Sequence, residues 1–355
     1  MKTGIVGLPQ AGKTTIFRVL ARTSDALTLE RSRRSQPNVG IVRVPDERVD
    51  FLASVFTPRK TTYATIELVD VGPLVRGTGR ELALESVRDV DALVHVVRAF
   101  DEGVPHPQGS VDPDRDIRDL DSELILADLQ SVEKRLERIR KEMGKSKDAA
   151  REREHALLER IREWLETGRP LREMELASEE SKQVRGFAFL SEKPIIHAIN
   201  IGEEQVSLLL ARPDGHSAPA PNTGRVYISG KLEAEMAELP TEDLQSFLED
   251  YGLRESGMIR LVRSTYDLLG LISFLTAGEE ECRAWTIRRG TTAQRAAGAI
   301  HSDLEKHFIR AEVCRFEEFR KHGSFRALRE RGLLRLEGKD YIVEDGDIIT
   351  VRHSG

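Results

Sequence analysis

The chain has 355 residues, of which 39% are hydrophobic and 32% are charged, and its formal net charge is −6. This length predicts two or three domains, and the negative charge excludes bulk attraction to nucleic acid as the organising force, although it is compatible with a local basic face. Two cysteines and the lack of an apolar run of about 18 residues argue against a disulfide-stapled secreted domain and against a membrane span, so we expect a cytoplasmic protein without a membrane partner.

The N-terminal segment carries a phosphate-binding motif. Residues 7–14, GLPQAGKT, contain two glycines separated by four residues and followed by Lys and a hydroxyl side chain, which is the P-loop pattern. Residues 3–6 predict a buried strand before this loop and residues 15–20 a helix after it, as the motif requires. In such loops the Lys contacts β- and γ-phosphate oxygens and the hydroxyl binds Mg²⁺. We therefore expect Lys13 and Thr14 to be catalytic, with Thr14 as a metal ligand, and the phosphate-binding residues to be Pro9, Gln10, Ala11, Gly12, Lys13, Thr14 and Thr15.

Two apolar, β-branched stretches follow a polar, basic loop at residues 28–36. Residues 38–44 and 61–71 predict a second and a third strand, and the third ends near Asp70. Nucleotide hydrolases of this class hold Mg²⁺ through water with a carboxylate at that place, so Asp70 is a candidate metal ligand. The alternative is that Asp70 simply ends a strand. Residues 92–100 predict another buried strand, which makes this part of the chain an α/β sheet.

The pattern changes near residue 129, where apolar residues begin to recur at spacings of three and four among Glu, Lys and Arg. This seam and a second one at residues 158–165 are typical of a coiled coil. Strand patterns resume at residues 193–200 and 225–231, so we expect an antiparallel helical hairpin inserted into the nucleotide domain. Most hairpin charges are expected to form a solvated surface, whereas the cations of the tip, residues 144–154, are candidates for contact with an acidic partner.

Two features of the resumed sheet need separate mention. His197 lies inside an apolar strand, where we expect a core histidine rather than a catalyst. The Pro-, Gly- and Ala-rich loop at residues 211–223 has no assigned role.

The C-terminal segment predicts a separate unit. Strand patterns at residues 282–288, 341–343 and 348–352, with an amphipathic helix at 293–308, indicate a small sheet wrapped on one helix, which is a β-grasp arrangement. Residues 315–335 mix Arg and Lys with three phenylalanines, which fits either an RNA-facing surface or a solvated face with core aromatics.

The predicted fold class is α/β. It combines a P-loop NTPase sheet of the G-protein-like kind, an inserted antiparallel coiled-coil hairpin and a C-terminal β-grasp domain. We place the nucleotide-binding domain at residues 1–115 and 185–275, the hairpin at residues 116–184 and the β-grasp domain at residues 276–355.

The segment after the strand at 193–200 indicates which base is bound. GTP-binding relatives of this fold have Asn-Lys-x-Asp here, and the Asp accepts two hydrogen bonds from guanine. This chain has Asn200-Ile201-Gly202-Glu203, so the Lys is absent and the longer Glu displaces the carboxylate, whereas the Asn200 amide can still bond an adenine edge. The sequence therefore favours ATP over GTP, with the base-binding candidates Asn200, Ile201, Glu203, Ser229 and Gly230.

Several short stretches form a specific ensemble: residues 7–14, 37–40 (PNVG), the pair Asn200 and Glu203, 274–278 (FLTAG), 283–286 (RAWT), 308–313 (FIRAEV) and 336–341 (LEGKDY). Over nearly its entire length the chain resembles the Obg-like ATPases of the YchF type, which have a P-loop domain, an inserted helical hairpin and a C-terminal TGS (ubiquitin-like β-grasp) domain. The resemblance implies Mg²⁺-dependent ATP binding with slow hydrolysis, a cytoplasmic location and association with ribosomes. The TGS domain and the hairpin are then the expected contacts with a ribosome or RNA.

Four positions depart from the family's pattern. Gln10 stands where an Asn usually helps to coordinate K⁺, an ion that acts as a fixed arginine finger, so the expectation of K⁺ activation is weakened. Arg34 occupies the place of a Thr in the switch I loop. Pro73 stands where a backbone N–H should meet the γ-phosphate, and proline has none. Leu74 replaces the water-orienting Gln of Ras-like enzymes, so any hydrolysis must depend on Lys13, Mg²⁺ and positioning.

Two functions are compatible with these features. The first is a slow ATPase switch in which Lys13 and Thr14 hold phosphate and Mg²⁺, Asp70 supports the metal and Asn200 reads adenine. The second is a catalytically weak, divergent paralogue that binds nucleotide as a regulatory ligand in a ribosome or RNA interaction module. A conventional GTPase is a third alternative.

Overall fold

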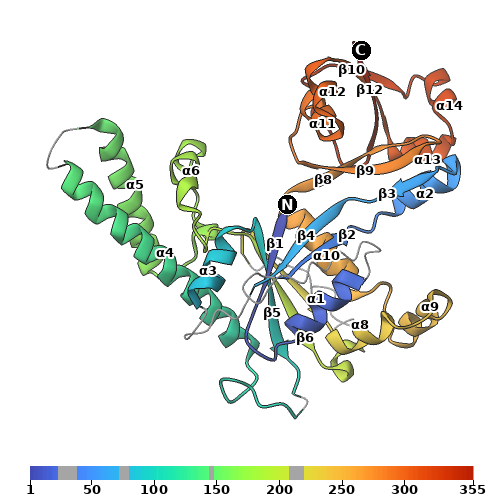
Figure 1. Ribbon diagram of the computed structural model, residues 1–355. Helices are drawn as coiled ribbons and strands as arrows, with labels where there is room; N and C mark the ends of the chain where they lie inside the picture. The colour runs from blue at the N-terminus through green and yellow to red at the C-terminus, as the bar shows by residue number, and fades with distance from the viewer. Residues whose placement is uncertain (23–37, 72–79, 102, 144–147, 208–219, 355) are drawn as a thin grey trace. The chain divides into compact units, whose positions relative to one another are not determined.

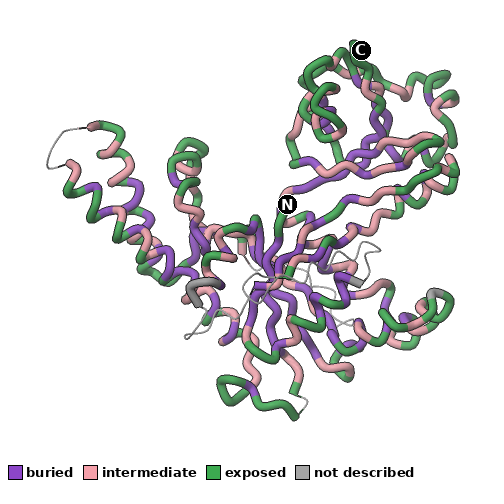
Figure 2. Tube along the Cα trace, viewed as in Figure 1, coloured by how far each residue is buried: buried purple, intermediate pink, exposed green. Residues whose placement is uncertain are grey.

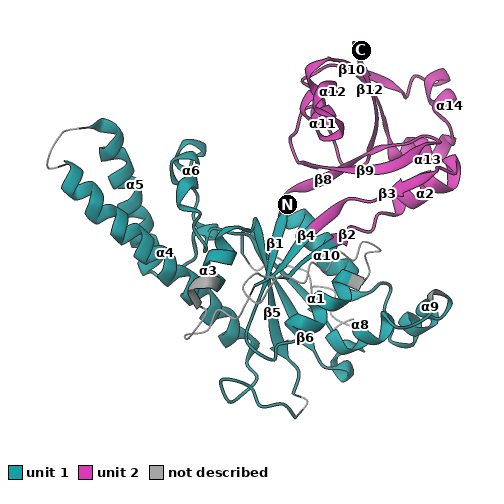
Figure 3. Cartoon of the chain, in the orientation of Figure 1, with its two compact units in different colours: residues 1–41, 67–268 teal, residues 42–66, 269–355 magenta. Residues whose placement is uncertain are grey.

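The structure is a computed structural model that describes residues 1–22, 38–71, 80–101, 103–143, 148–207 and 220–354. The chain divides into two compact units (Figure 3). The first unit comprises residues 1–41 and 67–268, and the second comprises residues 42–66 and 269–355. Each unit is built around its own six-stranded sheet.

Six strands form the sheet of the first unit, in the spatial order β2 (Asn38–Arg43), β4 (Thr65–Asp70), β1 (Lys2–Val6), β5 (Ala92–Ala99), β6 (Ile195–Ile201) and β7 (Thr223–Ile228) (Figure 1). Strand β1 is parallel to β4 and β5, and β5, β6 and β7 continue in parallel. Parallel sheets are covered on both faces and therefore have apolar strands throughout. All residues of β6 are buried, and Figure 2 shows burial concentrated along these strands. The expected α/β sheet is thus confirmed.

Helices cover both faces of this sheet (Figure 1). On one face, α3 (Arg80–Arg88) and α4 (Pro113–Met143) pack on β1 and β5 through a hydrophobic cluster that includes Val6, Val87 and Leu124. On the other face, α1 (Lys13–Arg22) packs against α8 (Gly230–Met236) and α10 (Gly257–Leu268). The remaining short elements are α6 (Ser178–Val184), α9 (Thr241–Asp250), η1 (Leu171–Glu173), η2 (Arg185–Phe187) and η3 (Glu203–Gln205).

The predicted helical hairpin is confirmed. Helix α4 continues beyond the sheet and pairs with α5 (Ala149–Glu166), and the apolar residues of both predicted seams lie in one cluster. Ion pairs join the two helices across the seam, with 2.8 Å between Arg135 Nε and Glu154 Oε1 and 2.8 Å between Arg140 Nη2 and Glu159 Oε1. Part of the hairpin charge is therefore paired between the helices. Even with α4 included, none of the helices in the described ranges has the length and apolar character needed to cross a membrane.

The sheet of the second unit has the order β11 (Arg335–Glu337), β10 (Phe308–Arg315), β12 (Asp347–His353), β8 (Leu271–Thr276), β9 (Glu281–Arg288) and β3 (Lys60–Thr62). Helix α11 (Ala293–Ile300) packs on it, since Ala293 and Ala296 share a cluster with Phe274, Val313 and Ile349. Strands β8 and β12 are parallel neighbours. One helix packed on a mixed sheet is the expected β-grasp arrangement.

Two sequence expectations for the second unit are wrong in detail. The helix expected at residues 293–308 ends at Ile300, because His301 is extended (φ −160°) and its side chain caps the separate helix α12 (Ser302–Lys306). Phe308 then opens β10. Residues 341–343 form no strand, since Ile342 makes only an isolated bridge with Thr292.

The three phenylalanines between residues 315 and 335 belong to an aromatic cluster. Phe316 and Phe319, in α13 (Phe316–His322), are buried, and Phe325 opens α14 (Phe325–Glu330). The rings of Phe316 and Phe319 contact Phe51 and Phe56, with centroid distances of 5.6 Å in both pairs. Of the two interpretations of this stretch, core aromatics therefore agree with the structure.

Residues 42–66 belong to the second unit, although the predicted domain boundaries placed them in the nucleotide-binding domain. Their helix α2 (Glu47–Phe56) carries Phe51 and Phe56, and β3 pairs in parallel with β9. Arg48 Nη1 also lies 2.8 Å from Asp345 Oδ2. The stretch predicted as one strand at 61–71 is divided accordingly, since β3 joins the second sheet and β4 the first.

Candidate nucleotide-binding site

The P-loop lies at the carboxyl end of β1, where the chain turns from the sheet into α1. Its glycines are required by close approach of the backbone. Gly7 has φ +147°, and a Cβ there would lie 2.4 Å from Val96 O on β5. Gly12 has φ +98°, and a Cβ there would lie 2.3 Å from Asn200 Nδ2 on β6. Only glycine adopts this backbone without a clash, so the loop sits tightly on two neighbouring strands.

The Lys13 side chain hydrogen-bonds backbone carbonyls of the P-loop. Its Nζ donates to Gly7 O at 2.7 Å and to Leu8 O at 2.8 Å. Burial lowers the pKa of Lys13, and the nearby Asp70 carboxylate opposes that shift. An ammonium has three hydrogens, so one remains to point toward a phosphate at the N-terminus of α1, where Thr14 and Thr15 are exposed.

Asp70 ends β4 at the same edge of the sheet, paired in register with Ile5. Burial raises its pKa, while a hydrogen bond with the Asn38 side chain and the Lys13 ammonium lower it. The sequence motifs did not assign a role to Asn38, because its partner follows 32 residues later on another strand. Asn38 thus orients the predicted metal-binding carboxylate.

The donor set suits Mg²⁺ bound together with a nucleotide. Throughout the described ranges there is no group of three or more His, Cys, Asp or Glu side chains that could hold a metal. Mg²⁺ usually keeps several waters and takes one or two protein ligands plus substrate phosphates. The exposed Thr14 hydroxyl and the Asp70 carboxylate fit that arrangement.

Asn200 links the P-loop to the first residue of α8. Its Nδ2 donates to Ala11 O at 3.0 Å, and its Oδ1 accepts from Gly230 N at 2.9 Å. The side chain is buried at the end of β6. One Nδ2 hydrogen remains for a ligand, so reading of adenine by Asn200 stays a prediction, while the bridge is a structural role that the sequence reasoning missed.

Glu203 is held on both sides of its carboxylate. Its Oε2 lies 2.8 Å from Lys231 Nζ, and its Oε1 accepts a 2.5 Å hydrogen bond from the Tyr251 hydroxyl. The hydrogen bonds from Lys231 and then Tyr251 lower the pKa of Glu203. Neither partner was singled out from the sequence, because Tyr251 lies 48 residues away. Two residues before Lys231, the buried Ser229 Oγ has no hydrogen-bond partner among the described residues.

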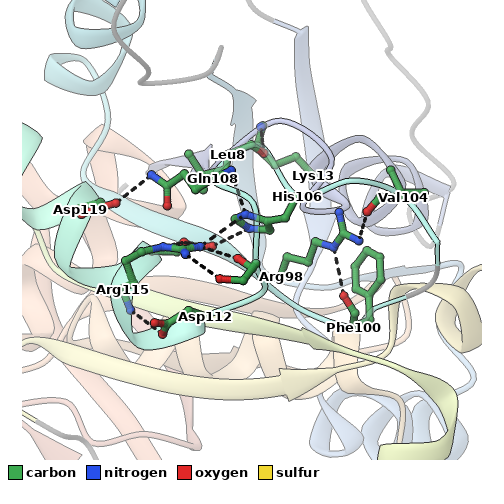
Figure 4. A network of polar contacts seen from close by, with 12 residues as sticks. Leu8, Lys13, Arg98, Phe100, Val104, His106, Gln108, Asp112, Arg115 and Asp119 are labelled. Carbon is green, nitrogen blue, oxygen red and sulfur yellow. Dashed lines mark hydrogen bonds and ion pairs between the residues drawn. The ribbon is translucent and has the colours of Figure 1, made fainter.

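The loop between β5 and α4 is ordered by side chains shown in Figure 4. His106 Nδ1 accepts from Gln108 N at 3.2 Å, so its Nε2 carries the hydrogen donated to Asp116 Oδ2 at 3.0 Å. Arg115 also binds Asp116, with 2.8 Å between Nη2 and Oδ1. Arg98, buried at the end of β5, donates to Phe100 O and Val104 O. Sequence reasoning missed this network because an Asp in the first turn of a helix is ordinarily explained by the helix dipole.

A cavity of about 390 Å³ lies between the P-loop and α4. Gly7, Leu8 and His95 line one side of it, and acidic residues of α4, including Asp116, Asp119 and Glu123, line the other. An anionic phosphate is repelled by such a wall. The phosphates are therefore expected at the N-terminus of α1 rather than in this cavity.

His197 is a core histidine, as expected. It pairs with His95 on the neighbouring strand, with 3.2 Å between the two Nδ1 atoms, and both side chains are buried. Burial lowers the pKa of His197 to about 3 and also lowers that of His95. One ring donates and the other accepts, so both imidazoles are neutral.

Several predicted positions lie outside the described residues. These are Arg34, Pro73, Leu74 and most of the loop at 211–223. Within the P-loop, Pro9 and Gln10 are exposed, and Gln10 adopts the left-handed conformation with φ +64°. Asn tolerates that conformation better than Gln does.

Comparisons with known proteins found matching family models and similar relatives. Residues 2–143 match a family model described as a 50S ribosome-binding GTPase, and residues 271–354 match the YchF GTPase C-terminal model, described as a protein of unknown function. The ribosome-binding ATPase YchF of Bacillus subtilis is 39% identical over 366 residues, covering 99% of both chains. Its counterpart in Escherichia coli O157:H7 is 38% identical, covering 98% of both.

A solved structure extends the likeness to three dimensions. The Schizosaccharomyces pombe YchF GTPase is similar with a TM-score of 0.86 at 30% identity, covering 99% of this chain and 97% of that one. The bacterial relatives align over almost the whole length of the chain. The chain therefore belongs to the YchF family.

Proposed function

We propose that the chain binds ATP with Mg²⁺ at the P-loop and hydrolyses it slowly to ADP and phosphate, as a cytoplasmic switch that associates with ribosomes. The observation that carries this proposal is the convergence of Lys13, Asp70 and Asn200 at one edge of the parallel sheet. Ligands of open α/β sheets bind outside the carboxyl ends of the strands. The names of the bacterial relatives, ribosome-binding ATPases, support the nucleotide and the partner.

The proposed roles follow from charge and position. Lys13 binds the β- and γ-phosphate oxygens, and the backbone N–H groups at the start of α1, including those of Thr14 and Thr15, receive the phosphates. Thr14 and Asp70 hold Mg²⁺, Asp70 through water. When bound, the metal neutralises charge that develops on the transferred phosphoryl group. Asn38 orients Asp70 through its side-chain hydrogen bond.

Adenine is the proposed base. Glu203 is engaged by Lys231 and Tyr251 and is not free to bind guanine as an unpaired Asp would be. Asn200 retains one amide hydrogen, and Ser229 Oγ is buried without a partner among the described residues. A buried polar atom without a partner is unfavourable unless a ligand satisfies it. Ile201, Ser229 and Gly230 complete the proposed pocket.

We expect wild-type protein to bind ATP and ADP more tightly than GTP and GDP. The Lys of the guanine motif is replaced by Ile201, and Glu203→Asp alone should not create a full guanine site, because shortening the side chain does not supply that Lys. Calorimetry with the four nucleotides in the presence of Mg²⁺ measures this. A clear guanine preference of the wild type would contradict the proposed ATPase and favour a conventional GTPase.

The catalytically weak paralogue is the second candidate, favoured by Gln10 and Pro73. The double variant Gln10→Asn with Pro73→Gly should raise K⁺-stimulated phosphate release. It should also raise the preference for an ATP analogue over ADP by about tenfold, because position 73 regains an N–H for the γ-phosphate. Gln10→Asn alone is the control for the K⁺ effect. Strong K⁺ stimulation of the wild type, with a preference for the analogue above about a hundredfold, would exclude the weak paralogue.

The ribosome contact is proposed for the hairpin and the second unit. Their expected contacts with ribosome or RNA rest on the family resemblance and on the basic residues of the hairpin tip, residues 144–154. Pelleting with purified ribosomes, with ATP analogue and with ADP, is the corresponding measurement.

A further inference from the structure

The carboxylate of Glu203 is hydrogen-bonded by one side chain of α8 and by another at the C-terminal cap of α9. Lys231, in α8, binds Oε2 at 2.8 Å, and Tyr251, which follows the last residue of α9, donates its hydroxyl to Oε1 at 2.5 Å. Both oxygens that an Asp-type guanine reader presents to the base are therefore already hydrogen-bonded. The position of Glu203 in the chain does not reveal these two hydrogen bonds.

We propose that Tyr251 is a positioning residue that sets the base selectivity of the nucleotide site, by withholding the Glu203 carboxylate from guanine. The inference rests on the proposed ATP-binding function of the same site. It adds that the replacement of Asp by Glu at position 203 does not by itself account for the selectivity between adenine and guanine. The hydroxyl of Tyr251 is the second determinant.

The physical reason lies in the hydrogen-bonding edges of the two bases. Guanine offers two donors, N1–H and the 2-amino group, which one carboxylate must meet with both oxygens. Each oxygen can still accept a second hydrogen bond, but Lys231 and Tyr251 fix the orientation of the carboxylate, so turning both oxygens toward guanine weakens the Tyr251 bond. A hydrogen bond to a charged group is among the stronger ones. Adenine has an acceptor at N1 and an amino donor at C6, so it does not need both oxygens. The Tyr251 bond therefore disfavours guanine and leaves adenine binding unaffected.

Packing holds Tyr251 in this position. Its ring packs 5.1 Å, centroid to centroid, from Phe247 on α9. It also lies against a hydrophobic cluster that contains Ile201 and Leu232, which are close in sequence to Glu203 and Lys231. A ring already held against this cluster loses little side-chain entropy in making the hydrogen bond. The Tyr251 ring that bonds Glu203 is thus anchored on the edge of a hydrophobic cluster of the first unit, while the Lys231 and Glu203 side chains are partly exposed.

The test is Tyr251→Phe, which removes the hydroxyl and keeps the ring. We measure the dissociation constants of ATP and GTP by calorimetry in Mg²⁺ buffer for the full chain. Wild type should favour ATP, and in the variant the ratio of the GTP constant to the ATP constant should fall by about tenfold. The ATP constant itself should change by less than about twofold.

A matched control is available in the second unit. The Tyr63 hydroxyl also donates to a carboxylate, that of Asp50, so Tyr63→Phe removes the same kind of bond within the other unit. Its GTP to ATP ratio should equal that of the wild type. Lys231→Met removes the partner of the other Glu203 oxygen and should lower the ratio in the same direction, which provides a test if Tyr251→Phe folds poorly.

The outcomes separate the inference from the proposed function. A ratio in Tyr251→Phe and Lys231→Met within about twofold of the wild type would overturn the inference. Equal weakening of ATP and GTP would also overturn it, because a purely structural hydroxyl would affect both nucleotides alike. Wild-type protein that binds neither nucleotide would instead contradict the proposed function, and the inference with it.

Discussion

Lys13→Ala is expected to weaken ATP binding by more than about tenfold. The ammonium is the charged group that faces the β- and γ-phosphates, and truncating one partner of a buried, hydrogen-bonded charge pair typically costs about 2–5 kcal/mol. The side chain also bonds the carbonyls of Gly7 and Leu8, so its loss loosens the loop that presents the backbone N–H groups. Calorimetric titration with ATP and Mg²⁺ measures the effect.

Lys193→Ala is the matched control. Like Lys13, Lys193 donates to two backbone carbonyls, those of Arg88 and Val90, and burial lowers its pKa. It lies before β6, at the opposite end of that strand from Asn200. Its removal should reduce stability without reducing ATP affinity. Retention of ATP affinity in Lys13→Ala within about twofold of the wild type would mean that the P-loop no longer binds phosphate.

The unfolding free energy of the first unit is expected to fall as the pH drops below about 6.5. The pKa of His197 is lowered to about 3 and that of His95 is lowered as well, mainly by burial, with a further contribution from the cation of Arg172. Between the folded and unfolded pKa values the unfolded chain binds more protons, so stability is complete above the unfolded value and is lost as the pH falls through this window. The loss approaches about 1.4 kcal/mol per pH unit for each histidine.

His197→Gln should remove one histidine's share of this loss, about 2–3 kcal/mol between pH 6.5 and pH 4.5. The amide can still hydrogen-bond His95 but does not titrate. Urea unfolding at the two pH values, followed in the first unit, provides the measurement. An unaltered pH dependence in His197→Gln would show that the buried pair does not control acid sensitivity.

Contiguous patterns predicted the largest share of the fold. The P-loop lies within eight residues, so its backbone geometry follows from two glycines whose added Cβ atoms would clash with β5 and β6. The hairpin seam was visible because apolar residues recur every three or four positions, which places them on one face of a helix. His197 was correctly expected in the core because its strand is apolar on both sides. Each of these predictions depends on neighbours in the chain.

The second unit shows where local pattern was insufficient. Residues 42–66 were expected in the nucleotide-binding domain, but α2 and β3 complete the aromatic cluster and the sheet of the second unit. The helix expected to run through residue 308 stops at His301, because an extended backbone there caps the next helix. Pairing partners more than 200 residues apart decide where residues 42–66 belong, and no local period records them.

The sequence by itself determined the family, the P-loop, the strand that ends in Asp70 and the departure from the guanine motif at Ile201 and Glu203. Only the tertiary structure decided what these side chains contact. The Asn200 amide donates to Ala11 O and accepts from Gly230 N. The Glu203 carboxylate accepts hydrogen bonds from Lys231 and Tyr251. The physical reason is that a motif specifies which donors and acceptors are present. Which of them face one another depends on how distant helices and strands pack.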